Sequence, residues 1–266
     1  MGFETKGDDT MKVRPTIVAV LMAAVLAWVQ HADAADIKVL TAGAFKQVVV
    51  GMAGEFEKAT GHKLVVENDT VGALAKRIDT GEAFDVTFLA PAAIDDLIRK
   101  GKLADGSRVD LARVGIGVMV KEGAPKPDIG SVEAFKRALL DAKSVAYINP
   151  ASGGSSGIYL VKLFDQLGIA DQIKPKAKLK NGGYVAELIT GGEAELGIHQ
   201  ISEIVPVKGV TLIGPLPKEV QNYTTYSAGI SASAKEGEGA KALVKFLAGP
   251  RTGEFLKAKG MEPAGS

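Results

Sequence analysis

The sequence Asn149-Pro150-Ala151-Ser152-Gly153-Gly154-Ser155-Ser156-Gly157-Ile158-Tyr159 decides the fold. The apolar run before it, 145–148, predicts a buried strand, and from Ile158 onward apolar residues recur at helical spacing. A polar, glycine-rich turn therefore leads from a strand directly into a helix. The first amides of a helix lack partners within it, and the macrodipole makes that end positive, so this turn can receive an anion. In a simpler interpretation, one serine caps the helix and the glycines form the bend.

The same strand–turn–helix construction recurs along the chain. Strands are predicted at 37–41, 64–67, 86–89, 114–120, 145–148, 177–179, 196–199, 210–214 and 224–231. Helices are predicted at 45–60, 74–78, 91–100, 132–140, 158–167, 184–190, 239–247 and 250–259, with a short one from 202. This alternation predicts an α/β fold in which mainly parallel sheets are flanked by helices. Two successive series predict two lobes, with 36–115 and 222–266 in lobe 1 and 116–221 in lobe 2.

The first 34 residues have the pattern of a cleavable export signal. Lys12 and Arg14 precede an apolar run at 17–29, and Ala32-Asp33-Ala34 is typical of a cleavage site. The apolar run is shorter than the roughly 20 residues that a membrane-spanning helix needs. Residues 1–10 are more acidic than the start of a typical export signal, so Met11 is a candidate initiator.

Composition excludes several classes of function. The formal net charge of +1 gives no global reason to bind nucleic acid or an anionic membrane. The chain has no cysteine, which excludes disulfides, thiolate metal sites, a cysteine nucleophile and a lipoprotein anchor. We therefore expect a periplasmic protein that is not lipid-anchored.

The strand–helix turns are rich in small and polar residues. In open parallel sheets, ligands bind beyond the carboxyl ends of the strands, where such turns gather. Two lobes that face each other across these turns form a cleft that can close on a small polar ligand. The turns in question are 42–44, 69–72, 90–91, 152–157, 181–183 and 199–202.

The order of elements resembles that of the periplasmic molybdate-binding proteins, which are type II solute receptors of ABC importers. The resemblance covers nearly all of 36–261. Its most specific pieces are 39–45, Gly72-Ala73-Leu74-Ala75-Lys76-Arg77-Ile78, Phe84-Asp85-Val86, Ser156-Gly157-Ile158-Tyr159 and 193–198. It implies a two-lobed type II binding-protein fold, a small anionic solute in the interlobe cleft and an inner-membrane ABC permease as partner. We expect a monomer without a cofactor.

Three positions depart from the family pattern. Ala44 and Val71 stand where family members usually carry serines, and Gln200 stands where they place a tyrosine. A metallate only accepts hydrogen bonds, so each lost donor costs about 1–3 kcal/mol. Molybdate is therefore disfavoured, and a larger organic anion or polar solute is expected. We expect the ligand-binding residues to be Ala44, Phe45, Lys46, Thr70, Val71, Ala90, Ser152, Ser155, Ser156, Tyr159, Asn181, Gly182, His199 and Gln200.

An enzymatic alternative comes from the same superfamily, because aconitate isomerase resembles these receptors closely. Its proton shift requires cationic groups that balance three carboxylates. It also requires one positioned base. The candidate catalytic residues are His199, Lys46 and Tyr159, and Arg77 is a further candidate cation. Against this, the lysine and the arginine fit solvated helix faces, the tyrosine fits a core position, and the histidine fits a structural role.

A lesser alternative is a serine hydrolase. Residues 153–157 match Gly-x-Ser-x-Gly between a strand and a helix, as in a nucleophile elbow. His199 is the only histidine after this motif, and its acid would have to come from Asp165, Asp171, Glu187, Glu193 or Glu195.

No metal site is predicted. His62 and His199 are isolated in the sequence, and His31 belongs to the signal. The lysine-rich segment 174–180 contains no aromatic residue, so a polar surface strand is favoured over a nucleic-acid site.

Overall fold

The computed structural model describes residues 1–3 and 35–265. The chain divides into two units, Met1–Ala34 and Ala35–Ser266, and everything below concerns the second. The predicted export signal, with Met11 and the cleavage site, lies outside the described residues. In the described part of the chain, no helix has the length and hydropathy needed to cross a membrane.

A single curled sheet runs through the second unit. Its strand order is β2-β1-β3-β9-β4-β7-β5-β6, and β8 and β10 also pair with β4. The described strands are β1 (Asp36–Ala42), β2 (Lys63–Asp69), β3 (Val86–Leu89), β4 (Val109–Lys121), β5 (Val145–Ile148), β6 (Ala177–Lys180), β7 (Leu196–Gln200), β8 (Val210–Pro215), β9 (Tyr223–Ile230) and β10 (Glu262–Pro263).

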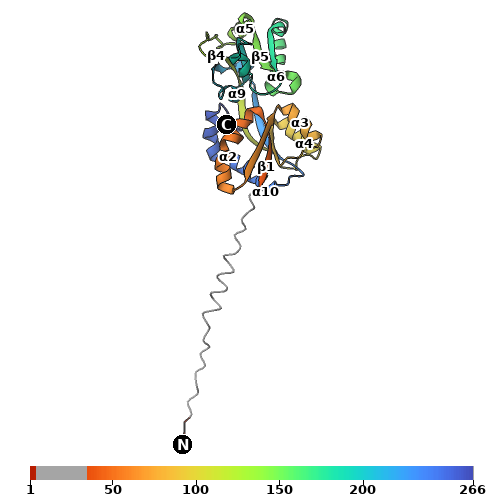
Figure 1. Cartoon of the computed structure of the whole chain (residues 1–266), viewed down its shortest axis with the longest axis vertical. Helices are drawn as coiled ribbons and strands as arrows, with labels where there is room; N and C mark the ends of the chain where they lie inside the picture. The colour runs from red at the N-terminus through yellow and green to blue at the C-terminus, as the bar shows by residue number, and fades with distance from the viewer. Residues whose placement is uncertain (4–34, 266) are drawn as a thin grey trace. The chain divides into compact units, whose positions relative to one another are not determined.

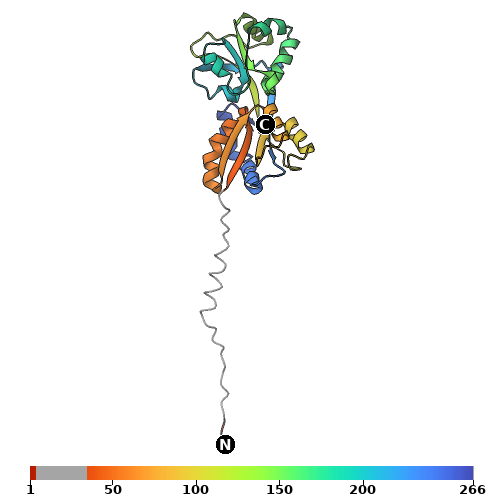
Figure 2. The ribbon, with the colours of Figure 1, turned by 45° about the vertical axis from the view of Figure 1, so that its right-hand side comes forward.

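Strand β4 connects two lobes. Its first half, from Val109 to Gly115, pairs with β9, and its second half, from Ile116 onward, pairs with β7 and β8. One lobe therefore contains β1, β2, β3 and β9, and the other contains β5, β6, β7 and β8 (Figures 1 and 2). The predicted two-lobed α/β fold is confirmed. The exact lobe boundaries, 36–115 with 222–266 and 116–221, stay a prediction.

Each lobe has a parallel centre with antiparallel additions. β1 pairs in parallel with β2 and β3, and β5 pairs in parallel with β6 and β7. β9 pairs antiparallel with β3 and β4. The parallel strands are those joined by crossover helices, as the alternating pattern predicts.

Helices cover the faces of the sheet. The described α-helices are α2 (Gly43–Thr60), α3 (Val71–Asp79), α4 (Pro91–Arg99), α5 (Val132–Asp141), α6 (Ser155–Gln166), α7 (Ala170–Ile173), α8 (Ala186–Thr190), α9 (Ile201–Ile204), α10 (Gly237–Leu247) and α11 (Pro250–Ala258). The strand predicted at 177–179 is confirmed as β6. The polar surface strand favoured for the whole segment 174–180 is only partly correct, because 174–176 forms a 3₁₀ turn around Pro175. Proline lacks the N–H that a ladder requires.

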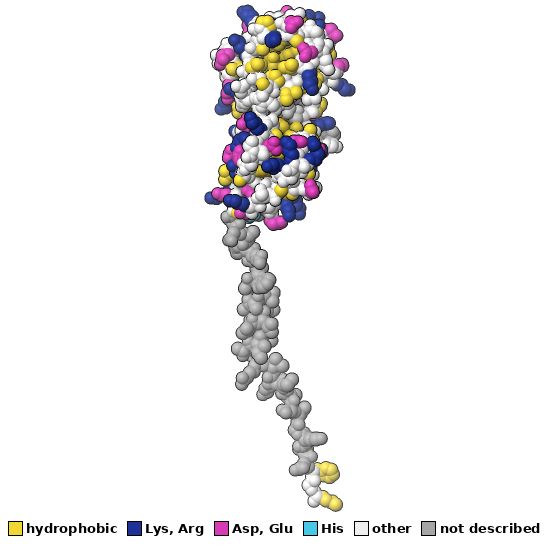
Figure 3. Space-filling view, turned by 90° about the vertical axis from the view of Figure 1, so that its right-hand side faces the viewer, with side chains coloured by type: hydrophobic (Ala, Val, Ile, Leu, Met, Phe, Trp, Pro, Cys, Tyr) yellow, Lys and Arg dark blue, Asp and Glu magenta, His cyan; other side chains and the backbone are white. Residues whose placement is uncertain are grey.

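Each lobe buries its own apolar core. Phe45, Phe56 and Phe88 are fully buried in the first lobe, and Phe135 and Phe164 are buried in the second. Helices α10 and α11 contact α2, so the end of the chain packs on the first lobe (Figure 1). On the face shown in Figure 3, acidic and basic side chains are interspersed, and this face carries no patch of a single sign.

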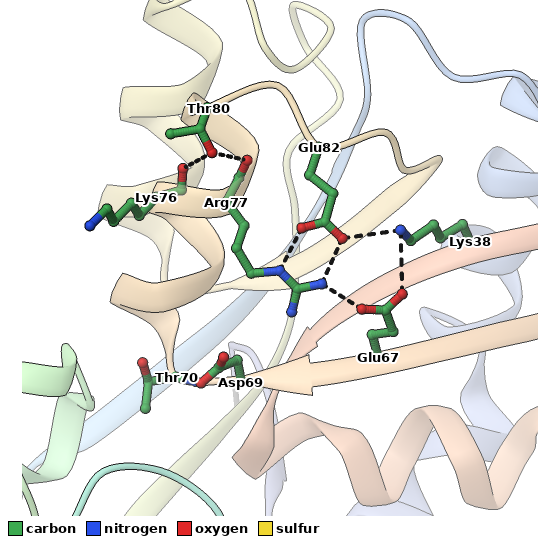
Figure 4. A network of polar contacts seen from close by, with 8 residues as sticks. All are labelled: Lys38, Glu67, Asp69, Thr70, Lys76, Arg77, Thr80 and Glu82. Atoms are coloured by element: carbon green, nitrogen blue, oxygen red, sulfur yellow. Dashed lines mark hydrogen bonds and ion pairs between the residues drawn. The ribbon is translucent and has the colours of Figure 1, made fainter.

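An ion-pair network ties α3 to the edge of the first lobe. The Arg77 guanidinium donates to both Glu67 and Glu82, and Lys38 contacts the same two carboxylates at 3.3 and 3.0 Å (Figure 4). The Arg77 hydrogen bond holds the pKa of Glu82 at about 2. Arg77 is therefore engaged in the first lobe's structure rather than offered as a free cation.

Replacing Arg77 with methionine is expected to lower the free energy of unfolding by about 1 kcal/mol at pH 7, because partly exposed ion pairs are screened by water. The pKa of Glu82 is depressed, so the stabilisation is fully present above the ordinary glutamate pKa of about 4.3 and is lost as the pH falls toward about 2. Urea unfolding at pH 7 and pH 3, with Arg99→Met on an exposed helix pair as control, measures this. An Arg77→Met effect that is equal at both pH values contradicts the assignment.

Candidate functional site

A pocket lies between the two lobes, with about 390 Å³ of empty space if the part open to solvent is included. Its walls come from the carboxyl ends of β1, β2, β5 and β7, the starts of the helices that follow them, the turn after β6, and one residue of β9. Its lining contains no lysine or arginine among the described residues. The lining residues are Ala42, Gly43, Ala44, Asn68, Asp69, Thr70, Val71, Ile148, Gly154, Ser155, Ser156, Gly182, Gly183, His199, Gln200, Glu203 and Tyr226.

Two long helices begin at this pocket without a side-chain cap. The N-cap of α2 is Ala42 and that of α6 is Gly154, and neither side chain can accept a hydrogen bond from the first turn. Neither first turn contains an acidic residue. The unpartnered amides and the positive ends of both dipoles therefore converge on one space, which suits an anion. At α3, by contrast, the hydroxyl of Thr70 accepts from the Ala73 amide at 3.2 Å.

The serine turn is organised by its own backbone rather than by a serine cap. The Ser152 hydroxyl donates to the Asn149 carbonyl at 2.7 Å, and Ser155 lies in hydrogen-bonding reach of the Tyr226 phenol. The interpretation in which a serine caps α6 is therefore wrong. Gly157 allows the helix to start directly over β5, because a Cβ there would lie 2.1 Å from the Ile148 carbonyl oxygen.

A buried carboxyl group and an imidazole face each other in the pocket. His199 Nε2 lies 3.4 Å from Glu203 Oε2, and the two residues are 2 % and 7 % exposed. Burial raises the pKa of Glu203 to about 8 and lowers the pKa of His199 to about 3. Desolvation without a balancing cation thus favours a neutral pair at pH 7 over an ion pair.

Polar atoms around this pair lack protein partners. Among the described residues, His199 Nδ1 and Gln200 Oε1 are buried without a hydrogen bond. The other end of the Gln200 amide donates to Thr224 Oγ1 at 2.9 Å. Burial is the main cause that raises the pKa of Tyr226, and the neighbouring Glu203 adds to this effect. Buried polar atoms without partners are uncommon, so these atoms indicate a place for a ligand or water.

The two lobes touch on either side of the pocket. The Gly72 amide donates to the Gly153 carbonyl at 3.1 Å, and the Thr70 hydroxyl donates to the Ser152 carbonyl. On another side, Gln47 Nε2 donates to the Tyr184 hydroxyl at 2.5 Å. These contacts join the two lobes around the pocket.

The structure brings together eight of the fourteen predicted ligand-binding residues. Five separate turns contribute to this convergence, and Ala44, Val71, Ser155, Gly182 and His199 represent one turn each. The residues in the lining are Ala44, Thr70, Val71, Ser155, Ser156, Gly182, His199 and Gln200.

The six other predicted residues do not line the pocket. Phe45 lies in the core, where its ring packs against Phe88 and Tyr226. The Tyr159 hydroxyl donates to the Val220 carbonyl at 2.8 Å, and the exposed Asn181 accepts from Asn149. Lys46, Ala90 and Ser152 also stand outside the lining. Of the candidate catalytic residues, only His199 reaches the pocket.

Sequence reasoning missed Glu203 and Tyr226, and it singled out the turn 69–72 without naming Asp69 as a ligand-binding residue. Glu203 follows His199 by four residues on the next short helix, and this spacing was the available signal. Alternation along β9 was the signal for Tyr226, because it shares an inward face with Thr224 and Ala228.

The hydrolase alternative requires a histidine that contacts the serine. In the described part of the chain, His199 forms no hydrogen bond with Ser155 or Ser156, and its carboxyl neighbour is Glu203. None of the five acids considered for a triad lines the pocket. The nucleophile, base and acid are therefore not assembled here.

A larger groove lies in the second lobe, with about 1350 Å³ of empty space. Its lining includes Val120, Pro125, Ala138 and Leu196, and it is mostly apolar. The one long helix in its wall, α5, is capped by Ser131, whose hydroxyl accepts from Ala134 at 3.1 Å. The start of α5 is therefore capped, unlike the two helix starts at the interlobe pocket.

A two-lobed α/β fold with a polar pocket between the lobes is typical of solute-binding proteins. The family model of the bacterial extracellular solute-binding proteins matches residues 37–262, and the chain belongs to this family.

Three comparisons with known proteins illustrate the relationship. The chain is 35% identical over 231 residues to an aconitate isomerase from Pseudomonas sp, covering 85% of this chain and 87% of the relative. It is 30% identical over 241 residues to the molybdate-binding protein ModA of Azotobacter vinelandii, covering 86% and 90%. The solved structure of the Azotobacter vinelandii periplasmic molybdate-binding protein has a TM-score of 0.71 at 23% identity, covering 85% and 98%. The predicted resemblance is thus confirmed.

Proposed function

We propose that this chain is a monomeric periplasmic receptor that traps a small anionic or polar organic solute between its lobes and delivers it to an inner-membrane ABC permease. The observation that carries the proposal is the pair of uncapped helix starts, at Gly43 and Ser155, that open into one pocket. Amide donors bind an anion without a full positive charge, so release on opening remains easy. The predicted signal and the lack of cysteine support export without a lipid anchor.

The lining favours an organic solute over a metallate. Ala44 and Val71 face the pocket with methyl groups where hydroxyl donors would serve a tetrahedral oxyanion. Asp69 and the unpartnered Oε1 of Gln200 add oxygen atoms that accept hydrogen bonds. A ligand with its own hydroxyl groups or protonated oxygens can satisfy these acceptors, whereas molybdate cannot.

A second candidate is an isomerase that shifts a proton on a small polycarboxylate. The 35% identity to an aconitate isomerase favours it, and so does the His199–Glu203 pair inside the pocket. One group of this pair would take the proton from one carbon, and the same or the other group would return it to another. Lys46 and Tyr159 lie outside the lining, so His199 and Glu203 are the groups that would carry this reaction.

A ligand panel tests the proposal. Purified mature protein is screened by thermal shift against citrate, trans-aconitate, malate, sugar acids, sulfate, molybdate and tungstate. A ligand at about 100 times its Kd stabilises by about 2.7 kcal/mol, which raises the Tm by roughly 5–10 °C at this chain length. We expect such a rise with an organic anion and none with molybdate.

Three outcomes test the ligand class and distinguish the receptor from the isomerase. A response to molybdate alone contradicts the interpretation of Ala44, Val71 and Gln200. No response to any solute contradicts the receptor. Conversion of trans-aconitate, followed by proton NMR and abolished in Glu203→Gln, identifies the isomerase instead.

A further inference from the structure

The interlobe pocket contains an acid that no cation balances. Glu203 is 7 % exposed, and its Oε1 lies 2.5 Å from the position that a Cβ on Gly43 would occupy. The carboxyl group therefore stands against the uncapped start of α2, and only a glycine leaves room for it. An anion that meets the first amides of α2 must also meet this carboxyl group.

We propose that Glu203 lines the pocket as a neutral carboxylic acid and donates a hydrogen bond to an oxygen of the bound anion. The inference rests on the proposed function, since it assumes that an anion occupies this pocket. It makes Glu203 a specificity-determining residue, because its proton turns one wall of the pocket from a repelling group into a hydrogen-bond donor. Binding is thereby coupled to the protonation of Glu203.

The groups around Glu203 do not favour its charged form. His199, the titratable residue of β7, is fully buried and cannot take up a proton easily. Tyr226 on β9 and Asp69 at the end of β2 also face the pocket, and neither carries positive charge. Burial accordingly raises the pKa of Glu203 to about 8.

The cations and acids on the neighbouring elements are occupied or lie elsewhere. On β4, Asp110 pairs with Arg108, Arg113 pairs with Glu262, and Lys121 is exposed at the strand end. β8 carries no titratable side chain. On α2, Lys46 is outside the lining, and its other charged residues, at 55, 57 and 58, lie in the last two turns.

Two unpartnered atoms support a ligand beside Glu203. His199 Nδ1 and Gln200 Oε1 are buried without partners among the described residues, and both residues line the same pocket. A ligand that offers a hydroxyl group or a protonated oxygen in addition to its negative charge can bond to Gln200 Oε1. The expected class is thus a hydroxy acid or a partly protonated carboxylic acid.

The first test does not require a known ligand. Infrared difference spectra of wild-type protein minus Glu203→Gln should show the carbonyl stretch of a buried carboxylic acid at pH 7, and this band should vanish between pH 8 and pH 10. The matched control is Glu193→Gln, which makes the same change at an exposed position of the same lobe. Absence of the band at pH 6–7 overturns the proposal.

The second test uses malate, a hydroxy acid of the ligand panel, as the probe in calorimetric titrations. The Kd of the wild-type protein and of Glu193→Gln should rise about tenfold per pH unit above the pKa of Glu203. In Glu203→Gln, an uncharged amide donor replaces the acid, so the Kd should stay within about threefold from pH 6 to pH 10. A wild-type Kd that is independent of pH overturns the proposal. Failure of malate to bind at any pH contradicts the proposed ligand class instead, and the infrared band then decides the state of Glu203.

Discussion

Gly153→Ala is expected to weaken ligand binding at least tenfold while the protein stays folded. Gly153 has φ +76, and a Cβ at this position would lie 2.6 Å from the Gly72 Cα in the other lobe. Backbone atoms cannot yield at that distance, so the methyl group must push the lobes apart. The Gly72–Gly153 hydrogen bond at 3.1 Å and the neighbouring Thr70–Ser152 bond would then be lost. The closed pocket that surrounds the ligand would be replaced by an open one.

The matched control for this substitution is Gly81→Ala. Gly81 has φ +97, so alanine there meets the same kind of backbone strain, about 1–2 kcal/mol, but no atom lies within 4 Å of its Cβ position. Calorimetric titration with the best ligand of the panel should separate the two variants, and small-angle scattering should show an opened Gly153→Ala. Equal affinity of wild-type and Gly153→Ala would show that the lobes do not need this contact.

Asp85→Ala is expected to lower the free energy of unfolding by about 3–5 kcal/mol. The Asp85 carboxylate is 5 % exposed and accepts three backbone hydrogen bonds, from Lys38 at 2.8 Å, Lys235 at 2.9 Å and Glu236 at 3.0 Å. It thereby joins β1 to the segment that starts α10. Alanine leaves three donors without an acceptor, and each unsatisfied buried group costs about 1–3 kcal/mol.

Thermal and urea unfolding measure this effect. A loss of this size should lower the Tm by roughly 10 °C, since 1 kcal/mol corresponds to about 2–4 °C at this chain length. The control is Asp105→Ala, at an exposed position in the same lobe, for which we expect a change below about 0.5 kcal/mol. An Asp85→Ala protein as stable as the control would mean that water replaces the carboxylate without penalty.

The alternation of strands and helices was predictable because it depends on local patterns. Hydrophobic periodicity and glycine or proline punctuation placed β5, α6 and their neighbours within a few residues of their observed bounds. The division of β4 between two lobes was not predictable in this way. That feature depends on pairing with β9 on one half and with β7 and β8 on the other, which joins residues far apart in the sequence.

The candidate site was also only partly predictable from the sequence. The convergence of Ala44, Val71, Ser155 and His199 could be predicted from topology alone, because the carboxyl ends of parallel strands share one edge. The direction of a side chain could not be predicted in this way. The Tyr159 hydroxyl, for example, donates to the Val220 carbonyl instead of facing the pocket. Glu203 was missed because a glutamate on a four-residue helix has the pattern of a surface residue, and only burial makes it chemically unusual.

Amide chemical shifts of the mature protein test the central claim most directly. When the best organic anion of the panel is added to ¹⁵N-labelled protein, the largest shifts should fall on Gly43 and Ala44 at the start of α2 and on Ser155 and Ser156 at the start of α6. Gly81→Ala should reproduce this pattern. Shifts confined to the apolar groove of the second lobe, around Val120 and Leu196, would contradict the account, because the solute would then bind away from the uncapped helix starts.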